Sequence, residues 1–308
     1  MAAGQGAWWP IMRVRAQIQL LPDGRRLYLH DGPINVILEA FGDPRQVQAA
    51  YCGAAGRFVT ILDELSEALP LLRQRMTEPG SVFSGVVAKR MAAAVRPYAT
   101  RTFITPMAAV AGAVAEEILA SMTSAACLEK AYVNDGGDIA LHLEVGQQFT
   151  VGMVDRPDQP SLFGSAVIDA HQPVRGIATS GWRGRSFSLG IADAVTVLAD
   201  CAAMADAAAT IIANAVNLLG HPNVIRVPAR QLAPDSDLGD LAVTQDVGHL
   251  TPQEISSALD SGETLAHDLA AEGLIRAAAL DLRGETRIVG IPLRTLDARE
   301  QEPNWVHA

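Results

Sequence analysis

The sequence predicts an α+β fold, and three patterns carry that prediction. A β-hairpin pattern opens the chain, long amphipathic helix patterns follow it, and short β-branched segments fill residues 130–200 before helices return. No glycine- or serine-rich linker divides the 308 residues. We therefore expect a single domain of two intertwined halves, approximately residues 12–125 and 126–290, followed by a short polar C-terminal tail.

The first half begins with strands. Apolar residues alternate on both sides of the turn-forming segment 22–25, and another extended run covers residues 33–38. Asp43 and Pro44 then supply an N-cap and a first-turn proline. Because apolar residues keep the helical period from there to about residue 72, this segment is predicted to be one long helix.

Two more helices complete the first half. One is predicted over residues 84–95, where the chain approaches Pro97. The other starts at Thr105 and Pro106 and is apolar on every side of its first turns, so we expect it to be buried all round. Its many small residues allow another backbone to approach closely.

The second half alternates sheet and helix patterns. About six short strands are predicted between residues 131 and 199, followed by a helix over residues 201–219 that Gly220 closes. The remaining predicted elements are a loop over residues 235–246, a helix from Thr251 to about Glu272 that opens on a capping box, and a hairpin around Arg283 and Gly284.

Charge and composition narrow the classes of function. The chain carries 24 basic and 34 acidic residues, a net charge of −10, so its overall field repels nucleic acid. The apolar stretches are broken before the roughly 20 residues that a membrane span needs, and the N-terminus lacks the apolar core of a signal peptide. We expect a cytoplasmic protein without nucleic-acid or membrane partners. Its alanine-rich helix faces favour a homodimer.

Common catalytic and metal-binding motifs do not occur in the sequence. The three cysteines, Cys52, Cys127 and Cys201, have no CxxC spacing and lie in apolar or alanine-rich contexts, which predicts buried free thiols. The seven histidines make no zinc-binding spacing. The hydrolase, P-loop and Rossmann signatures GxSxG, GxxxxGKS/T and GxGxxG are missing.

One polar stripe runs along the helix predicted over residues 201–219. Asp206, Thr210, Asn214 and Asn217 share a sector of about 80° at 100° per residue. The stripe is either a solvated helix face or part of a site. A single carboxylate with a hydroxyl and amides suits an oxygen-ligand ion such as Mg²⁺, whereas solvated faces favour Lys, Glu and Arg.

Two glycine-bearing segments lie between predicted strands. Segment 134–138, with the sequence NDGGD, is either a plain hairpin turn or a loop whose backbone N–H groups face an anion. Segment 179–186, with the sequence TSGWRGRS, is either a solvated loop or a phosphate-binding segment, because it is rich in hydroxyl and guanidinium donors.

Taken in order, three motifs make the chain similar to the ApbE-like superfamily, which includes the flavin transferases once called thiamine biosynthesis lipoproteins. They are VNDGGDIAL at 133–141, ATSG at 178–181 and ADAAAT at 205–210. Segments 103–117 and 188–217 resemble the soluble branch of that superfamily. The resemblance implies a duplicated, T-fold-like architecture of mixed or antiparallel sheets and long packed helices, with a flavin-nucleotide cleft between the halves.

The resemblance also implies roles for individual residues. Asp206 and Thr210 match the pair that binds Mg²⁺ beside the FAD pyrophosphate, assisted by a backbone carbonyl near residues 109–110. Arg183 or Arg185 would balance developing charge, which makes these two arginines and Asp206 the expected catalytic residues. The residues expected to line the ligand are Asn134, Gly136, Gly137, Asp138, Thr179, Ser180 and Gly181.

Two departures from the family pattern keep three functions open. Ala111 stands where the transferases have a lysine, and segment 189–193 replaces an HIIDP-type stretch. The first function is Mg-dependent FMN transfer or FAD pyrophosphatase chemistry, and the second is non-catalytic binding of a flavin- or pterin-type ligand. The third is a step in tetrahydromethanopterin biosynthesis, because some members of the soluble branch accompany one-carbon metabolism based on that cofactor.

Overall fold

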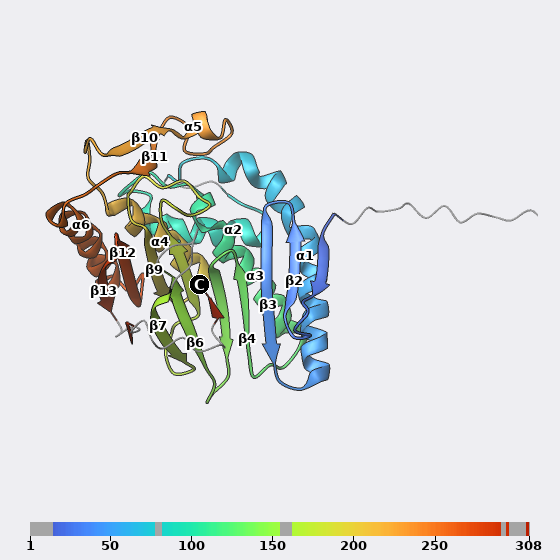
Figure 1. Cartoon of the computed structure of the whole chain (residues 1–308). Coiled ribbons are helices and arrows are strands. Elements are labelled where there is room, and N and C mark those ends of the chain that lie inside the picture. Colours follow the sequence, from blue (N-terminus) through green and yellow to red (C-terminus); the bar gives the residue numbers. More distant parts are fainter. Residues whose placement is uncertain (1–14, 78–81, 155–161, 291–293, 296–305, 308) are drawn as a thin grey trace, which may run out of the picture.

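A nine-stranded antiparallel sheet forms the centre of the fold (Figure 1). The computed structural model describes residues 15–77, 82–154, 162–290, 294–295 and 306–307. The sheet order is β1-β2-β3-β4-β5-β8-β9-β12-β13. These strands are β1 (Gln17–Leu20), β2 (Leu27–Asp31), β3 (Ile34–Phe41), β4 (Lys130–Asp135), β5 (Asp138–Leu143), β8 (Gly176–Ser180), β9 (Ala194–Ala199), β12 (Ala277–Leu282) and β13 (Glu285–Gly290).

Helices and a smaller sheet cover the two faces of the large sheet, so the predicted α+β class is confirmed. The helices are α1 (Pro44–Leu72), α2 (Val86–Val95), α3 (Val110–Ala125), α4 (Ala202–Ala215), α5 (Ala229–Leu232) and α6 (Pro252–Ala271), with 3₁₀ turns η1 (Arg96–Tyr98) and η2 (Pro106–Ala109). The smaller sheet contains β6 (Gln148–Val154), β7 (Leu162–Asp169), β14 (Arg294–Thr295) and β15 (Val306–His307), and β10 (Val224–Pro228) pairs with β11 (Ala242–Val247).

Side chains that alternate between the two faces of the central strands belong to two separate hydrophobic cores. On β4 and β5, Val133 and Ala140 belong to the core beneath the helices. Their neighbours Tyr132 and Leu141 belong to a second core that includes Phe149 of β6. Because successive strand residues point to opposite faces, the large sheet is buried on both sides over its middle strands.

Helix starts follow the capping residues in the sequence. Asp43 caps α1 by accepting a hydrogen bond from the backbone N–H of Arg45, at 2.9 Å. Thr251 and Glu254 form both hydrogen bonds of the capping box at the start of α6. Thr105 caps η2, which leads into α3, so that predicted helix begins with a 3₁₀ turn.

Close helix crossings explain two glycines. A Cβ atom on Gly53 of α1 would lie 2.9 Å from the carbonyl oxygen of Ser121 on α3. A Cβ on Gly112 of α3 would lie 2.4 Å from the carbonyl oxygen of Ala202 on α4. Real Cβ atoms do not approach oxygen so closely, so glycine allows α3 to pack against both neighbouring helices.

The segment Pro106–Ala125 is, among the described residues, a helix long and apolar enough to cross a membrane by length and composition alone. Glu116 and Glu117 break its apolar run before 20 residues, in agreement with the sequence, but the segment is not buried all round as expected. Here it packs against α1, α4 and β5 within the fold. Only 44% of its most apolar 18-residue window is buried, because Val110 and Ala111 line cavities while Glu116 and Glu117 form ion pairs.

Three further expectations need correction. The segment 235–246 is not all loop, since its last residues enter β11. The helix that carries the polar stripe ends at Ala215 rather than near residue 219. Buried thiols were expected, yet Cys52 and Cys127 are exposed and Cys201 is half-buried. Most of the predicted C-terminal tail lies outside the described residues, and the two-half duplication stays a prediction.

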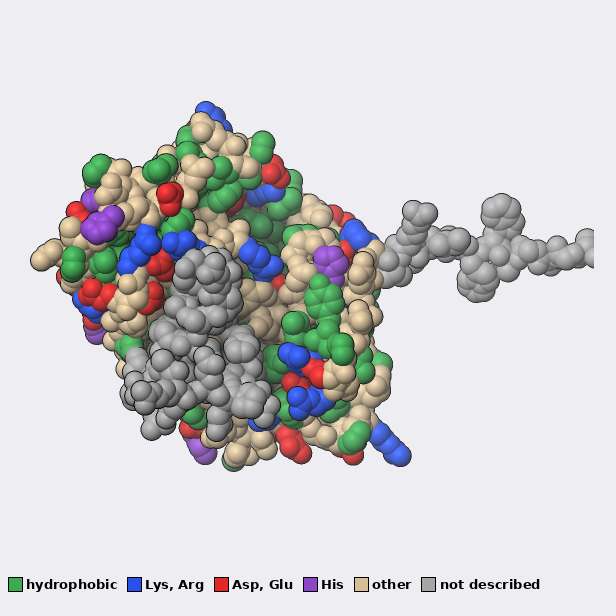
Figure 2. Space-filling model, viewed as in Figure 1, with side chains coloured by type: hydrophobic (Ala, Val, Ile, Leu, Met, Phe, Trp, Pro, Cys, Tyr) green, Lys and Arg blue, Asp and Glu red, His purple; other side chains and the backbone are tan. Residues whose placement is uncertain are grey.

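The visible surface carries mixed charge. On the face shown in Figure 2, acidic and basic side chains alternate among polar atoms, and the described part of that face has no broad basic patch. The described residues on this face therefore form no extended basic track of the kind that binds a phosphate backbone.

Candidate functional site

A polar cavity of about 290 Å³ lies where α3, α4 and the large sheet meet. We call it the polar cavity. Asp206 and Thr210 on α4 line it, one helical turn apart, together with Asp138 at the start of β5 and Ser180 at the end of β8. Side chains of η2, the start of α3 and the segments 185–189 and 236–238 complete the wall.

The polar stripe divides into two parts. Asp206 and Thr210 are half-buried and face the polar cavity. Asn214 accepts a hydrogen bond from the backbone N–H of Leu189 at 2.8 Å, and Asn217 donates to the carbonyl oxygen of Leu189 at 2.8 Å. The stripe is therefore not a solvated face, because its second part anchors the segment that walls the cavity.

The Asp206 carboxylate is held by the first turn of α3. Its Oδ2 accepts a hydrogen bond from the Gly112 N–H at 3.1 Å, which satisfies a donor that a helix N-terminus leaves free. Burial raises the pKa of Asp206 to about 7, the hydrogen bond from Gly112 opposes that rise, and the negative charge of Asp135 adds to it.

The segment NDGGD forms a two-residue hairpin turn between β4 and β5. Gly136 and Gly137 have φ values of +68° and +116°, and the Asn134 Oδ1 accepts from the Gly137 N–H at 2.8 Å. Of the two structures expected for this segment, the backbone therefore adopts the plain hairpin turn. The turn nonetheless brings Asp138 to the polar cavity, where burial and the carboxylates of Asp206 and Asp135 raise its pKa well above the usual value.

Arg185 lies across this hairpin turn. A Cβ atom on Gly136 would fall 1.4 Å from the Arg185 guanidinium, so the arginine packs directly on the glycine backbone. Arg185 is exposed and makes no hydrogen bond or ion pair with another described residue. It lines one cavity with Asp135 and another with Asp138, and its positive charge opposes the rise that burial causes in the pKa of both carboxyls.

Arg183, the other predicted catalytic arginine, is engaged elsewhere. Its Nε lies 3.0 Å from the Asp193 Oδ1, and its guanidinium stacks 4.3 Å from the centre of the Trp182 ring. The lining of the polar cavity includes Arg185 but not Arg183. The structure therefore does not bring Arg183 to the cavity, whereas Arg185 lies on its wall.

The segment after β8 is fixed by Asp193, which sequence reasoning did not single out. This buried carboxylate accepts hydrogen bonds from Trp182 Nε1, Arg183 Nε and the Arg283 backbone N–H. A Cβ on Gly181 would lie 2.3 Å from the Asp193 carbonyl oxygen, so the chain needs glycine there. The sequence does contain a signal for this residue, because Asp193 is a lone carboxylate within an apolar run.

Of the predicted ligand-lining residues, Ser180 and Asp138 face the polar cavity. The hydroxyl of Thr179 instead pairs with that of Thr196 on β9 at 2.9 Å. Thr179 also contributes its backbone N–H to the Asp138 carboxylate. The glycines shape the chain around the cavity, so the two glycine-bearing segments meet at one site.

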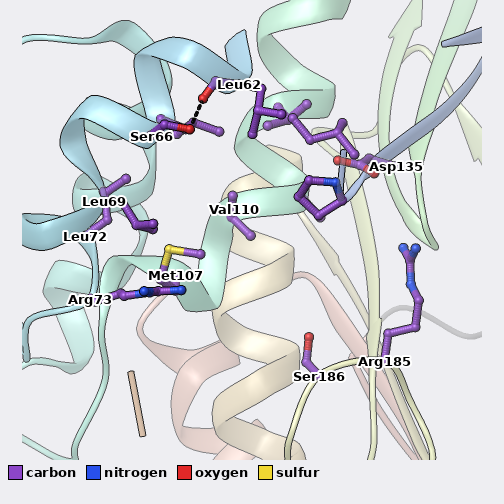
Figure 3. A pocket seen from close by; sticks show the side chains of 15 residues that line it. Leu62, Ser66, Leu69, Leu72, Arg73, Met107, Val110, Asp135, Arg185 and Ser186 are labelled. Atoms are coloured by element: carbon purple, nitrogen blue, oxygen red, sulfur yellow. Dashed lines mark hydrogen bonds between the residues drawn. The ribbon is translucent and has the colours of Figure 1, made fainter. Parts of the chain in front are cut away.

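A second cavity of about 520 Å³, which we call the apolar chamber, lies between α1 and α3. Figure 3 shows Leu69, Leu72 and Met107 on one side of it and Asp135 and Arg185 on the other. The two cavities share the lining residues Met107, Val110, Ala111, Arg185 and Ser186. They are therefore neighbouring cavities, and these residues border both of them.

Comparison with known proteins assigns the family. Residues 18–288 match the family described as "AbpE bacteria". The chain belongs to this family. It is 40% identical over 129 residues to a UPF0280 protein of Methanopyrus kandleri and 38% identical over 116 residues to one of Methanosarcina barkeri. These matches cover 42% and 37% of this chain and 48% and 44% of the relatives, about half their length.

Solved structures give a more distant likeness. The apo form of the flavinyl transferase ApbE from Pseudomonas stutzeri aligns with a TM-score of 0.40 and 10% identity over 90% of this chain and 94% of that one. A mutant form of the flavin transferase ApbE from Vibrio cholerae aligns with a TM-score of 0.34 and 11% identity over 89% and 96%. Superposition at this level places no individual residue.

The donor set at the polar cavity fits Mg²⁺ that is shared with a ligand. Among the described residues, no group of three or more His, Cys, Asp or Glu side chains could hold a metal ion alone. Asp206, Thr210 and Asp138 offer two carboxylates and a hydroxyl. Mg²⁺ is usually held by one or two carboxylates, with waters and substrate phosphates as the other ligands, so this set suffices for such an ion.

The raised carboxylate pKa values predict how stability changes with pH. Asp206 and Asp135 have a folded-state pKa of about 7, against roughly 3.9 in an unfolded chain. Between these values the folded protein keeps protons that the unfolded chain has released, so the contribution of these groups to stability is lost as pH rises from about 4 to about 7.

In thermal melts with EDTA, we therefore expect the wild-type protein to lose more stability between pH 5 and pH 8 than Asp206→Asn does. Added Mg²⁺ should raise the wild-type Tm at pH 8 more than at pH 5, since the metal binds the deprotonated carboxylate. Identical pH profiles for the two proteins, with no effect of Mg²⁺ at pH 8, would contradict this interpretation.

Proposed function

We propose that the protein binds FAD with Mg²⁺ and cleaves the pyrophosphate bond, as an FMN transferase or FAD pyrophosphatase of the ApbE type. The observation that supports the proposal most strongly is that the polar cavity is lined by Asp206, Thr210, Asp138 and Arg185. Membership of the AbpE family and the order of the three sequence motifs support it.

The chain's own residues then have distinct tasks. Asp206 and Thr210 supply metal ligands, and bound Mg²⁺ would polarise the phosphate oxygens. Arg185, free of other ion pairs among the described residues, donates hydrogen bonds to the phosphate and balances charge on it. Asp138 lines the same cavity and, in its ionised form, would accept the proton of the attacking hydroxyl; burial and the neighbouring carboxylates raise its pKa, so it holds that proton more firmly than an ordinary aspartate does.

The products of this chemistry depend on which group attacks the phosphate. With water as the attacking group, FAD gives FMN and AMP. With a threonine hydroxyl, FMN forms a phosphoester bond with the protein and AMP leaves. In both reactions the bond between the two phosphates breaks. Ala111, where the transferases carry lysine, leaves this part of the wall uncharged and favours neither acceptor by itself.

Incubation with FAD and Mg²⁺, followed by chromatography and mass spectrometry, tests the proposal. AMP is the expected product, together with either FMN or a protein whose mass has increased by that of FMN less one water, and EDTA should abolish both reactions. FAD that binds and stays intact would leave a non-catalytic binding protein, and FAD that neither binds nor reacts would refute the proposal. The comparisons lend no support to the tetrahydromethanopterin alternative.

A further inference from the structure

The apolar chamber has an aliphatic lining that the flavin chemistry does not use. Its volume is about 520 Å³, larger than that of the polar cavity and within the range of small-molecule sites. Leucine, isoleucine, valine, methionine, alanine and proline make up most of the wall, and no aromatic side chain lines it among the described residues. The leucines come from one face of α1 and the valines from α3.

The polar side chains of the chamber lie on two sides of it, and those on α1 already have partners within the protein. Ser66 donates its hydroxyl to the carbonyl oxygen of Leu62 at 2.7 Å, so it is satisfied by its own helix (Figure 3). Arg73 is paired with Asp235 at 2.8 Å. Asp135 and Arg185 lie together on the far side, and of these Arg185 has no hydrogen-bond or ion-pair partner among the described residues.

We propose that the apolar chamber binds an alkyl phosphate, with its single aliphatic chain between α1 and α3 and its phosphate against Arg185. The phosphate oxygens would accept hydrogen bonds from the guanidinium. A phosphate monoester also carries an O–H in its monoanionic form, which can donate to the Asp135 carboxylate, whereas an alkyl carboxylate has no such donor.

The chemistry of the wall sets this ligand apart from a flavin or pterin ring. Those rings carry several nitrogen and oxygen atoms, and burying such atoms without hydrogen-bond partners costs free energy. Away from the Asp135–Arg185 side, the described wall is aliphatic except for Ser66 and Arg73, which already have partners in Leu62 and Asp235, and Ser186, so most of such a ring would face carbon atoms. A saturated or isoprenoid chain has no hydrogen bonds to lose there, and its transfer from water to the chamber is favourable in free energy.

The inference goes beyond the proposed function, because it involves neither flavin nor metal. Since Arg185 lines both cavities, a phosphate held there lies at the border of the polar cavity. The chamber would thus admit a second phosphate-bearing ligand to the site where FAD is proposed to react. Its test needs no turnover, so each proposal can fail without the other.

Isothermal titration calorimetry with hexyl, octyl and decyl phosphate, in EDTA and without FAD, tests the site. We expect one ligand per chain and about fourfold tighter binding for each added methylene until the chamber is filled. Inorganic phosphate should bind far more weakly, and decyltrimethylammonium should not bind. Equal affinity for all three chain lengths, or stronger binding of the cation, would overturn the proposal.

Matched variants locate the binding. Leu69→Trp and Ser66→Trp place a large ring in the chamber wall and should each weaken decyl phosphate binding at least about tenfold. Leu71→Trp makes the same change at an exposed neighbour on α1 that does not line the chamber and should leave binding unchanged. Arg185→Gln should abolish the preference for decyl phosphate over decanol.

Two results would assign the chamber differently. If the wall variants and the Leu71 variant bind decyl phosphate equally, the ligand lies elsewhere and the proposal is wrong. If wild-type protein binds none of the alkyl phosphates, while Leu69→Trp changes its oligomeric state in analytical ultracentrifugation, the chamber faces a second copy of the chain and the proposal is equally overturned.

Discussion

Asp206→Asn is expected to lower Mg²⁺-dependent turnover of FAD by at least about a hundredfold while the protein stays folded, since losing a metal ligand removes several kcal/mol of transition-state stabilisation. The asparagine keeps an oxygen that can accept from the Gly112 N–H, so the contact with α3 survives. Without metal at pH 8 its stability should equal or exceed the wild-type value, because a buried charge near Asp138 and Asp135 is gone.

Two comparison variants separate the chemical role from the structural one. Asp206→Ala also removes the acceptor for Gly112, so it should be inactive and less stable by about 1–3 kcal/mol. Asp268→Asn makes the same charge change on an exposed position of α6 and should keep full activity. If Asp206→Asn turned over FAD at the wild-type rate, Asp206 would be only a cap for α3.

Gly112→Ala is expected to destabilise the protein by about 1–3 kcal/mol, the usual effect of overpacking. The new methyl would lie 2.4 Å from the carbonyl oxygen of Ala202 and 2.7 Å from the Ala203 nitrogen, both backbone atoms of α4 that cannot rotate away. The helices must separate, which also moves the Gly112 N–H away from Asp206. Urea unfolding followed by circular dichroism measures the loss.

Gly56→Ala is expected to have the opposite effect and to stabilise the protein. Gly56 is exposed in the middle of α1, and a Cβ there meets no atom within 4 Å. Alanine lowers the entropy of the unfolded chain and suits a helix, so this variant should be about 0.4–1 kcal/mol more stable. Equal urea midpoints for the two variants would mean that the α3–α4 contact imposes no constraint.

Local chemistry made much of the fold predictable. Asp43 with Pro44, and Thr251 with Glu254, begin helices where capping rules place them, and the turn at Gly136 and Gly137 joins two strands as paired glycines do. The AbpE family membership was also predictable from ordered motifs. These features depend on residues close together in the chain.

Features that depend on distant contacts were not predictable. The hydrogen bond from Gly112 to Asp206 joins residues 94 positions apart. The hydrogen bond from Arg183 to Asp193 forms only because the loop between them is packed against the rest of the fold. The sequence likewise could not show that Arg185 crosses the Gly136 turn between two cavities. The cytoplasmic location, the homodimer and the T-fold duplication remain predictions.

Divalent-cation binding at Asp206 and Thr210 is measured most directly with Mn²⁺, whose free-ion EPR signal disappears on binding. Titration in the presence of FAD should show one bound ion per wild-type chain, and Asp206→Asn should weaken that binding at least about tenfold. Equal Mn²⁺ binding by the two proteins would show that the ion does not lie at this carboxylate and would remove the basis of the proposed chemistry.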